Sequence, residues 1–224
     1  MAATQPSIDG VGAGVRAGAP LAVPMLLIGT SFGIEAVTRG WGVVTPIAMS
    51  MLTFSGAAQI AVLGVLAAGG DVVAALAAGI LVNLRFLPVG IAIGPSIGGG
   101  IVRRALTGQA IVDASLTMAR LAEGRYGARR LIGSTAPQWL GWQAGTIVGV
   151  VIGSQLGDPG RYGVDALFPA FFLVLLLREL GERRARVTAA AAASIAVVLL
   201  PVAPAGVPVI AACLAAFAGW RSST

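Results

Sequence analysis

Long apolar stretches follow one another along almost the whole chain, separated only by short connectors. A stretch of about 20 apolar residues is the length that an α-helix needs to cross the hydrocarbon core of a membrane. Only 11% of the residues are charged, whereas a soluble domain carries about 25%. The chain therefore cannot cover itself with a polar surface, and the sequence predicts an all-α, polytopic integral membrane protein.

The apolar stretches divide the chain into candidate spanning segments. Several of them are short for a full crossing, so the sequence predicts seven or eight transmembrane helices. Together they form a single transmembrane transporter domain, residues 1–224, in which residues 1–15 are a polar N-terminal tail. The segments cover approximately residues 18–37, 43–68, 72–97, 105–119, 131–156, 164–177, 187–200 and 207–220.

The basic residues orient the predicted helices. All 15 of them are arginines, and most lie in connectors. Short cytoplasmic loops of membrane proteins carry an excess of positive side chains. With eight crossings, most of the arginines fall on the side of the two termini, which predicts that both termini are cytoplasmic. The net charge of +6 then follows from topology, and we predict no nucleic-acid partner.

Glycines recur every four residues from Gly141 to Gly157. This spacing places them on one face of a helix, which can receive a neighbouring helix at close range. Gly149 and Gly153 also match Gly29 and Gly33 in the first segment at a constant offset. Chance is one explanation in a chain with 32 glycines. The other is a duplication, which predicts a parallel internal repeat in which the first and fifth segments run in the same direction.

Two charged residues lie inside apolar stretches, Arg85 in "LVNLRFLPVG" and Asp113 in "IVDASLTMA". Charged groups inside a membrane face protein or water, and most are paired. A rise of 1.5 Å per residue puts them at similar depths, about 20 Å and about 16 Å from the cytoplasmic side. We predict that they pair or bracket a polar site near the midplane. The alternative is that Arg85 reaches outward from a shorter third helix.

Further polar residues extend this candidate substrate site. Ser55 and Gln59 are four residues apart and so share one helix face. Asn83 lies two residues before Arg85. Polar side chains in membrane helices bond across helices or line a polar path. Prolines within or near the apolar runs free backbone carbonyls that can also bind a substrate; they are Pro24, Pro46, Pro88 and Pro169. Elsewhere, the spacing of Glu35 and Arg39 predicts an exposed ion pair at a membrane face.

Several kinds of chemistry have no residues to support them. The chain contains no lysine for a phosphate-binding loop and no histidine for zinc protease or Ser-His chemistry. Its one cysteine, Cys213, permits no internal disulfide and no cysteine metal site. The sequence therefore predicts that the protein is not an enzyme and uses no cofactor or metal. It leaves open a secondary transporter, a non-transporting membrane subunit and a passive small-solute channel.

The chain resembles the AzlC family of bacterial branched-chain amino acid permeases over most of its length, least so after about residue 185. The resemblance lies in "GTSFGIEA", "MSMLTFSGAAQIAVLGVLAAGG", "LVNLRFLPVG", "VDASLTMA" and "YGVDALFPAFFLVLLL". The most specific elements are an S-x3-F-[AS]-G-A-A-Q run and a later N-L-R. Two positions depart from the family's pattern: Phe86 replaces the usual histidine, and Ala114 replaces the usual acidic residue after Asp113.

The resemblance implies a function that the residues alone do not. It implies export of the branched-chain amino acids leucine, isoleucine and valine across the bacterial inner membrane, together with a small AzlD-type membrane subunit. The candidate site agrees with a zwitterionic substrate, because a carboxylate could meet Arg85 and an ammonium group could meet Asp113. The two departures at Phe86 and Ala114 bear on proton coupling or on substrate preference.

Overall fold

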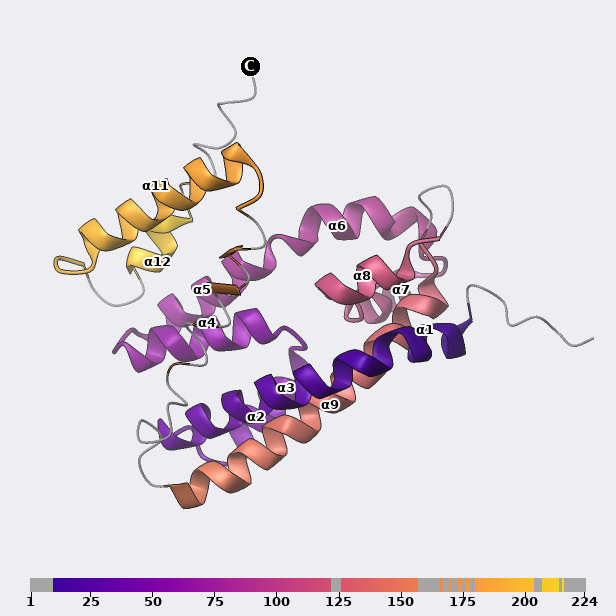
Figure 1. Ribbon diagram of the computed structural model, residues 1–224, viewed down its shortest axis with the longest axis horizontal. Helices are drawn as coiled ribbons and strands as arrows, with labels where there is room; N and C mark the ends of the chain where they lie inside the picture. Colours follow the sequence, from indigo (N-terminus) through magenta and orange to yellow (C-terminus); the bar gives the residue numbers. More distant parts are fainter. Residues whose placement is uncertain are drawn as a thin grey trace, which may run out of the picture. The chain divides into compact units, whose positions relative to one another are not determined.

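The structure is a computed structural model that describes residues 10–121, 126–156, 166, 170, 173–174, 176–177, 180–203, 207–213 and 215. Its described residues form helices and turns without a strand, which confirms the all-α prediction (Figure 1). The chain forms two compact units. The first unit comprises Met1–Gly56 and Arg85–Gly157, and the second comprises Ala57–Leu84 and Asp158–Thr224. The prediction of a single transmembrane domain stays a prediction.

The first unit begins with one continuous helical stretch. It consists of α1 (Val11–Gly18), the 3-10 turn η1 (Ala19–Leu21) and α2 (Ala22–Thr38). The stretch ends at Gly40, whose φ of 83° lies in the left-handed region that favours glycine. There the Trp41 N–H donates to the Ala36 carbonyl at 3.1 Å. This bond satisfies a carbonyl at the helix end and turns the chain sharply.

The longest helix, α9 (Ala128–Leu156), lies along α1 and α2 (Figure 1). The helices run in the same direction, because Gly18 contacts Ser134 and Gly33 contacts Thr146 and Val150. Glycines on both sides allow the backbones to meet. A Cβ at Gly29 would lie 2.6 Å from the Trp142 carbonyl oxygen, and one at Gly149 would collide with the Thr30 carbonyl oxygen. The glycine ladder is therefore a helix-packing face.

Shorter helices complete the first unit, and they pack partly against the start of α9. They are α3 (Val44–Leu52), α6 (Phe86–Ile93), η2 (Gly94–Ser96), α7 (Ile101–Gly108) and α8 (Asp113–Ala119). A small apolar cluster joins Ile93, Ile97, Ala119 and Leu131. This cluster holds the end of the α6–η2 stretch, the end of α8 and the first turn of α9 together.

The second unit contains α4 (Gly56–Ala67) except its first residue, together with α5 (Val72–Asn83), α11 (Arg183–Leu199) and α12 (Val207–Ala212). Gly69 turns the chain after α4 with a φ of 84°. The Asp71 carboxylate then caps α5 by accepting from the Ala74 N–H at 2.8 Å. Gly79 of α5 packs against Val62 of α4, and α11 packs against α12.

Helix length and composition identify one clear membrane span in the described residues. It is Val11–Thr38, with 28 residues. The pair Val72–Asn83 and Phe86–Ser96, which is bent by 46° at its break, could form a second span. The fifth predicted segment lies in α9, which is long enough to cross a membrane but is not among the spans identified by length and composition. The remaining predicted segments are shorter helices in this structure or extend outside the described residues. The predicted count of seven or eight transmembrane helices is therefore not reached and stays a prediction.

The helix α9 has an unusual distribution of polar side chains. Five of its buried residues are polar, beside buried apolar residues and glycines: Ser134, Thr135, Gln138, Gln143 and Thr146. Its exposed large residues are apolar: Ile132, Leu140, Ile147, Val148, Val151 and Ile152. In water this distribution would be unfavourable, whereas in a bilayer the apolar side chains can face lipid while the polar ones bond within the protein. The mixed composition of α9 is thus compatible with a membrane.

Candidate functional site

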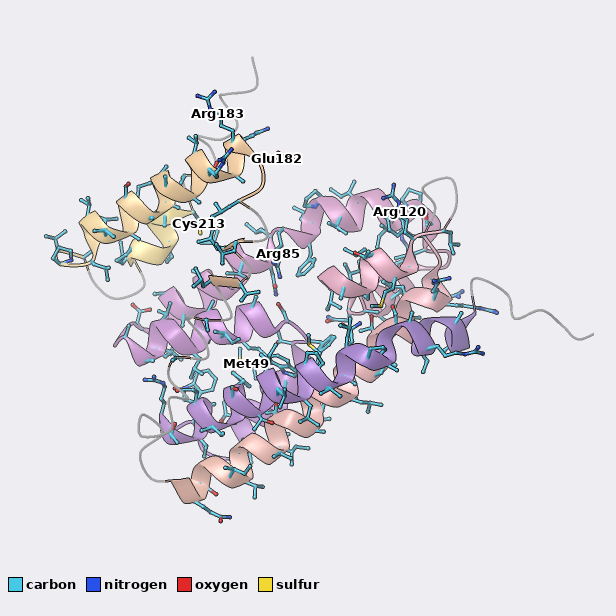
Figure 2. All side chains as sticks on the ribbon, viewed as in Figure 1. Met49, Arg85, Arg120, Glu182, Arg183 and Cys213 are labelled. Atoms are coloured by element: carbon cyan, nitrogen blue, oxygen red, sulfur yellow. The ribbon has the colours of Figure 1, made fainter. Side chains whose placement is uncertain are left out.

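Three predicted spanning segments are interrupted, and the predicted site residues lie at or beside the interruptions. Ser55 is the last residue of the break between α3 and α4. Asn83 ends α5, and Arg85, labelled in Figure 2, directly precedes α6. Asp113 is the first residue of α8. Four of the five predicted residues therefore lie at helix breaks, and broken helices in transporters leave backbone groups that can bind a substrate.

Gln59 and Ser55 belong to different units of the structure. Gln59 lies in the first turn of α4 and is fully buried, whereas Ser55 is half-buried at the end of the break. The chain passes from one unit to the other directly after Gly56 and returns directly before Arg85. The five predicted residues are therefore divided between the two units, and their shared role stays a prediction.

The prolines occupy helix starts. Pro24, Pro46 and Pro88 are each the third residue of a helix, in α2, α3 and α6. A proline in the first turn removes an N–H that has no helical partner there. Because a proline has no N–H, the carbonyl four residues before it accepts no helical hydrogen bond from it. For Pro88 this carbonyl is that of Leu84, which lies inside the break. Pro169 lies outside the described residues.

Trp142 of α9 holds the break between α3 and α4. Its indole Nε1 donates to Ser50 Oγ at 3.2 Å. Its ring also fills the space beside Gly56, where a Cβ would lie 2.6 Å from the ring. On another side the ring stacks on Phe32, with centroids 6.1 Å apart. The serine and the glycine of the S-x3-F-[AS]-G run thus both contact one tryptophan.

Further hydrogen bonds tie the end of α3 to α9. Ser50 Oγ and Thr146 Oγ1 are 3.1 Å apart, and Gln143 Nε2 donates to the Ser50 carbonyl oxygen at 2.6 Å. Thr146 Oγ1 also donates to the Trp142 carbonyl at 2.9 Å. The four side chains are buried. Gln143 Oε1 is buried as well and accepts no hydrogen bond from the described residues, so the cluster retains one free acceptor.

Sequence reasoning missed this cluster. The sequence shows Ser50 only as part of a motif, and residues 142–146 only as part of the glycine ladder. The signal was present in "GWQAGTIVG", because Trp142, Gln143 and Thr146 interrupt an otherwise apolar helix between closely packed glycines. Polar residues in a membrane helix usually face protein. The rule therefore predicts that these three side chains contact another helix, but it does not predict that the contacted residue is Ser50.

The break between α7 and α8 is also held by α9. The Ala110 carbonyl accepts from Ser115 Oγ at 2.8 Å and from Thr135 Oγ1 of α9 at 2.7 Å. Ser115 Oγ also accepts from the Val112 N–H at 3.0 Å. These bonds satisfy backbone groups that the interrupted helix leaves open. Asp113 follows directly, so its backbone position at the start of α8 is well supported.

The environment of Arg85 differs from the predicted buried pair. The Arg85 residue is exposed, and its guanidinium carbon lies 4.8 Å from the centre of the Phe86 ring. A cation over an aromatic face is attracted to the ring electrons. Phe86 is the residue that replaces the usual family histidine, so that departure supplies a contact for the arginine. The side chain of Asp113 lies outside the described residues, and its pairing with Arg85 stays a prediction.

The Glu35–Arg39 pair forms, but it is not the exposed pair that the sequence predicted. Arg39 Nε donates to Glu35 Oε2 at 2.7 Å. The arginine side chain is 41% exposed, whereas that of the glutamate is only 1% exposed. The prediction was wrong for Glu35 because i,i+4 spacing reports the neighbour on the same helix and gives no information about what covers the residue.

Comparisons with known proteins agree with these observations. The family model described as "AzlC protein" matches residues 20–156, which include the helix pair α2 and α9 and all five predicted site residues. The chain is 24% identical to "Inner membrane protein YgaZ" of Escherichia coli (strain K12), over 94% of this chain and 91% of that protein. No solved structure matches the chain. Because the family model covers more than half of the sequence, the chain belongs to the AzlC family.

Proposed function

We propose that the protein is a secondary transporter that exports branched-chain amino acids across the bacterial inner membrane with a small AzlD-type partner subunit. Membership of the AzlC family and similarity to an inner membrane protein support a transporter-type membrane protein. The substrate, the direction and the partner belong to the proposal.

The interruption of the helices at the predicted polar residues is the observation that carries the proposal. The breaks lie at residues 53–55, 84–85 and 109–112. A helix that only anchors a protein in the bilayer gains nothing from such breaks, because unsatisfied backbone groups are costly in lipid. A transporter uses them to bind polar groups of its substrate. The positive charge of Arg85 suits a carboxylate, and the apolar side chains of the predicted segments suit a branched aliphatic side chain.

The first experiment measures efflux of preloaded, labelled leucine from cells that produce the chain with its small partner. We expect efflux above that of cells without the chain, and a loss of at least about tenfold in Arg85→Ala, since one charge-assisted bond contributes roughly 1.5–3 kcal/mol. The control is Arg183→Ala, which removes an exposed arginine at the first residue of α11 (Figure 2). Unchanged efflux in Arg85→Ala would contradict the role of Arg85.

Reconstitution separates the alternatives to an exporter. A passive channel lets leucine equilibrate but cannot concentrate labelled leucine by counterflow, whereas a carrier does so. A non-transporting subunit gives no counterflow when the chain is reconstituted without its partner. Counterflow by the chain alone would exclude both alternatives, and its absence even with the partner present would reject the proposed function.

A further inference from the structure

The short helix α7 carries an exposed apolar side next to two arginines. Successive residues of a helix are about 100° apart, so its polar residues Arg103, Arg104 and Thr107 share one side. Thr107 is buried, whereas every residue from Ile101 to Leu106 is exposed. The opposite side is apolar and consists of Ile101, Val102, Ala105 and Leu106. This distribution is typical of a helix that lies in the interface of a membrane.

Both ends of α7 are held near the start of α9. Ile97, four residues before α7, belongs to the small apolar cluster that includes Leu131 of α9. Ala110, two residues after α7, packs against the same cluster, and its carbonyl accepts from Thr135 Oγ1 of α9 at 2.7 Å. Eight helical residues extend about 12 Å, whereas the hydrocarbon core is about 30 Å thick. The helix α7 therefore belongs to one side of the membrane.

Other arginines gather at the same end of the first unit. The helices α1 and α8 both contact the first turns of α9 (Figure 1). Gly14 of α1 packs against the Arg130 carbonyl, and Arg130 Nε donates to the Met118 carbonyl of α8 at 2.6 Å. Cytoplasmic segments carry an excess of positive side chains, so this end is predicted to face the cytoplasm. Its further arginines are Arg16, Arg120 and Arg129.

The two arginines of α7 are available for an anionic ligand. Both are exposed, and neither pairs with an acidic side chain in the described part of the chain. Each lies over a glycine: a Cβ at Gly99 would be 2.7 Å from Arg103 Cδ, and one at Gly94 would be 2.8 Å from Arg104 Nη2. A guanidinium binds phosphate through paired hydrogen bonds. A free phosphate ion would leave the apolar side of α7 in water, whereas a phospholipid contacts both sides.

We propose that α7 is an interfacial helix that binds anionic phospholipid in the cytoplasmic leaflet. Its apolar side lies among the upper parts of the acyl chains, while Arg103 and Arg104 bind lipid phosphate. The predicted fourth segment, residues 105–119, then stays near the cytoplasmic side, because Ala119 at its end belongs to the same cluster as Ile97. The inference requires a membrane, which the similarity to an inner membrane protein supports, and it does not depend on the proposed function.

The first test measures the depth of α7 in vesicles that contain the full chain. Leu106→Cys is combined with Cys213→Ala, so that a fluorescent label attaches at one position. Phospholipids brominated high or low on their acyl chains quench the label according to its depth, and iodide quenches it from water. We expect the shallow bromines to quench most and iodide to quench little. The matched control is Leu140→Cys, an exposed position in the middle of α9, which the deep bromines should quench most.

The second test identifies the lipid beside α7. The vesicles contain equal amounts of phosphatidylglycerol and phosphatidylcholine, and only one of the two carries bromine. We expect brominated phosphatidylglycerol to quench the label at Leu106→Cys at least about twofold more than brominated phosphatidylcholine, because arginines near the surface attract anionic lipid. The double substitution Arg103→Gln and Arg104→Gln should remove this preference, whereas lysine at both positions should keep it. The label at Leu140→Cys should show no preference.

The contrary outcomes are distinct. Deep quenching at position 106 would place α7 in the hydrocarbon core, and strong iodide quenching would place it in water. Protection from both quenchers would mean that protein covers the apolar side. Each of these results overturns the proposal, as does equal quenching by the two lipids or a preference that persists in the glutamine variant. If that variant does not fold, the lysine-free test is salt: we expect the preference to fall at high ionic strength, and a constant preference overturns the role of the arginines.

Discussion

At the scale of single residues, contacts with Trp142 explain why the motif around the first break has a serine at position 50 and a glycine at position 56. The serine hydroxyl receives the indole N–H, and the glycine six positions later leaves room for the indole ring. Both contacts are buried, so neither residue can be replaced without leaving a polar group unsatisfied or creating a collision. Packing against Trp142 therefore accounts for the serine and the glycine of the motif. A contact between Ser55 and the substrate would be a separate role.

Ser50→Ala tests this role. The change leaves the Trp142 N–H buried without its acceptor, and we expect the free energy of unfolding to fall by about 1–3 kcal/mol. Thermal unfolding of the purified protein in detergent measures the effect. Ser154→Ala is the matched control, because that serine is exposed and donates to the Val151 carbonyl of its own helix. We expect the control to change stability by less than about 0.5 kcal/mol. Equal shifts in both variants would contradict the assigned role.

At the scale of helices, close contact between α2 and α9 organises the first unit. Gly33 and Gly149 face one another, so that each backbone packs on the other. Without a hydrophobic driving force between helices in lipid, such close packing is a main source of association. The same direction of the two helices is what a parallel repeat requires. The duplication itself stays a prediction.

Gly33→Ala should weaken this helix pair. Its Cβ would lie 2.8 Å from the Val150 nitrogen and 3.0 Å from the Gly149 Cα. Backbone cannot move aside as a flexible side chain can, so we expect a loss of roughly 1–3 kcal/mol in stability. Gly12→Ala is the control, because nothing lies within 4 Å of its added Cβ. Alanine favours a helix over glycine by about 0.5–1 kcal/mol, so the control should be neutral or slightly more stable. Thermal unfolding distinguishes the two.

At the scale of the whole molecule, two compact units are connected where helices break. The chain passes between them after Gly56 and before Arg85. The third junction follows Gly157. The first two lie beside Ser55, Asn83 and Arg85, which the sequence predicts to be functional. A transporter needs parts that can move against each other around flexible joints. In the proposed function, the junctions after Gly56 and before Arg85 serve as such joints.

Reporter fusions test the orientation of the whole chain. We expect alkaline phosphatase to be inactive when it is fused after Thr224, because the arginine distribution predicts a cytoplasmic C-terminus. Green fluorescent protein at the same position should fluoresce. A phosphatase fusion after Gly42, in the connector predicted on the outer side, should be active and serves as the control. Phosphatase activity at the C-terminus would refute the predicted orientation.

The sequence by itself determined the all-helical class, the family, the glycine packing face and most of the residues at the helix breaks. These follow from local quantities such as composition, periodicity and motif spacing, which each segment carries independently of its neighbours. The two departures from the family pattern were also visible there. Phe86 then proved to be the residue that contacts the Arg85 guanidinium.

Only the tertiary structure decided which residues pack against these helix faces and motifs. It paired Ser50 with Trp142 and Gln143 across a separation of more than ninety positions. It also buried Glu35, which the helix spacing had placed at the surface, and left one of its oxygens without a bond in the described chain. The physical reason is that burial and hydrogen-bond satisfaction depend on the element packed opposite. A periodic pattern reports the face of a helix, but it does not identify the partner that covers it.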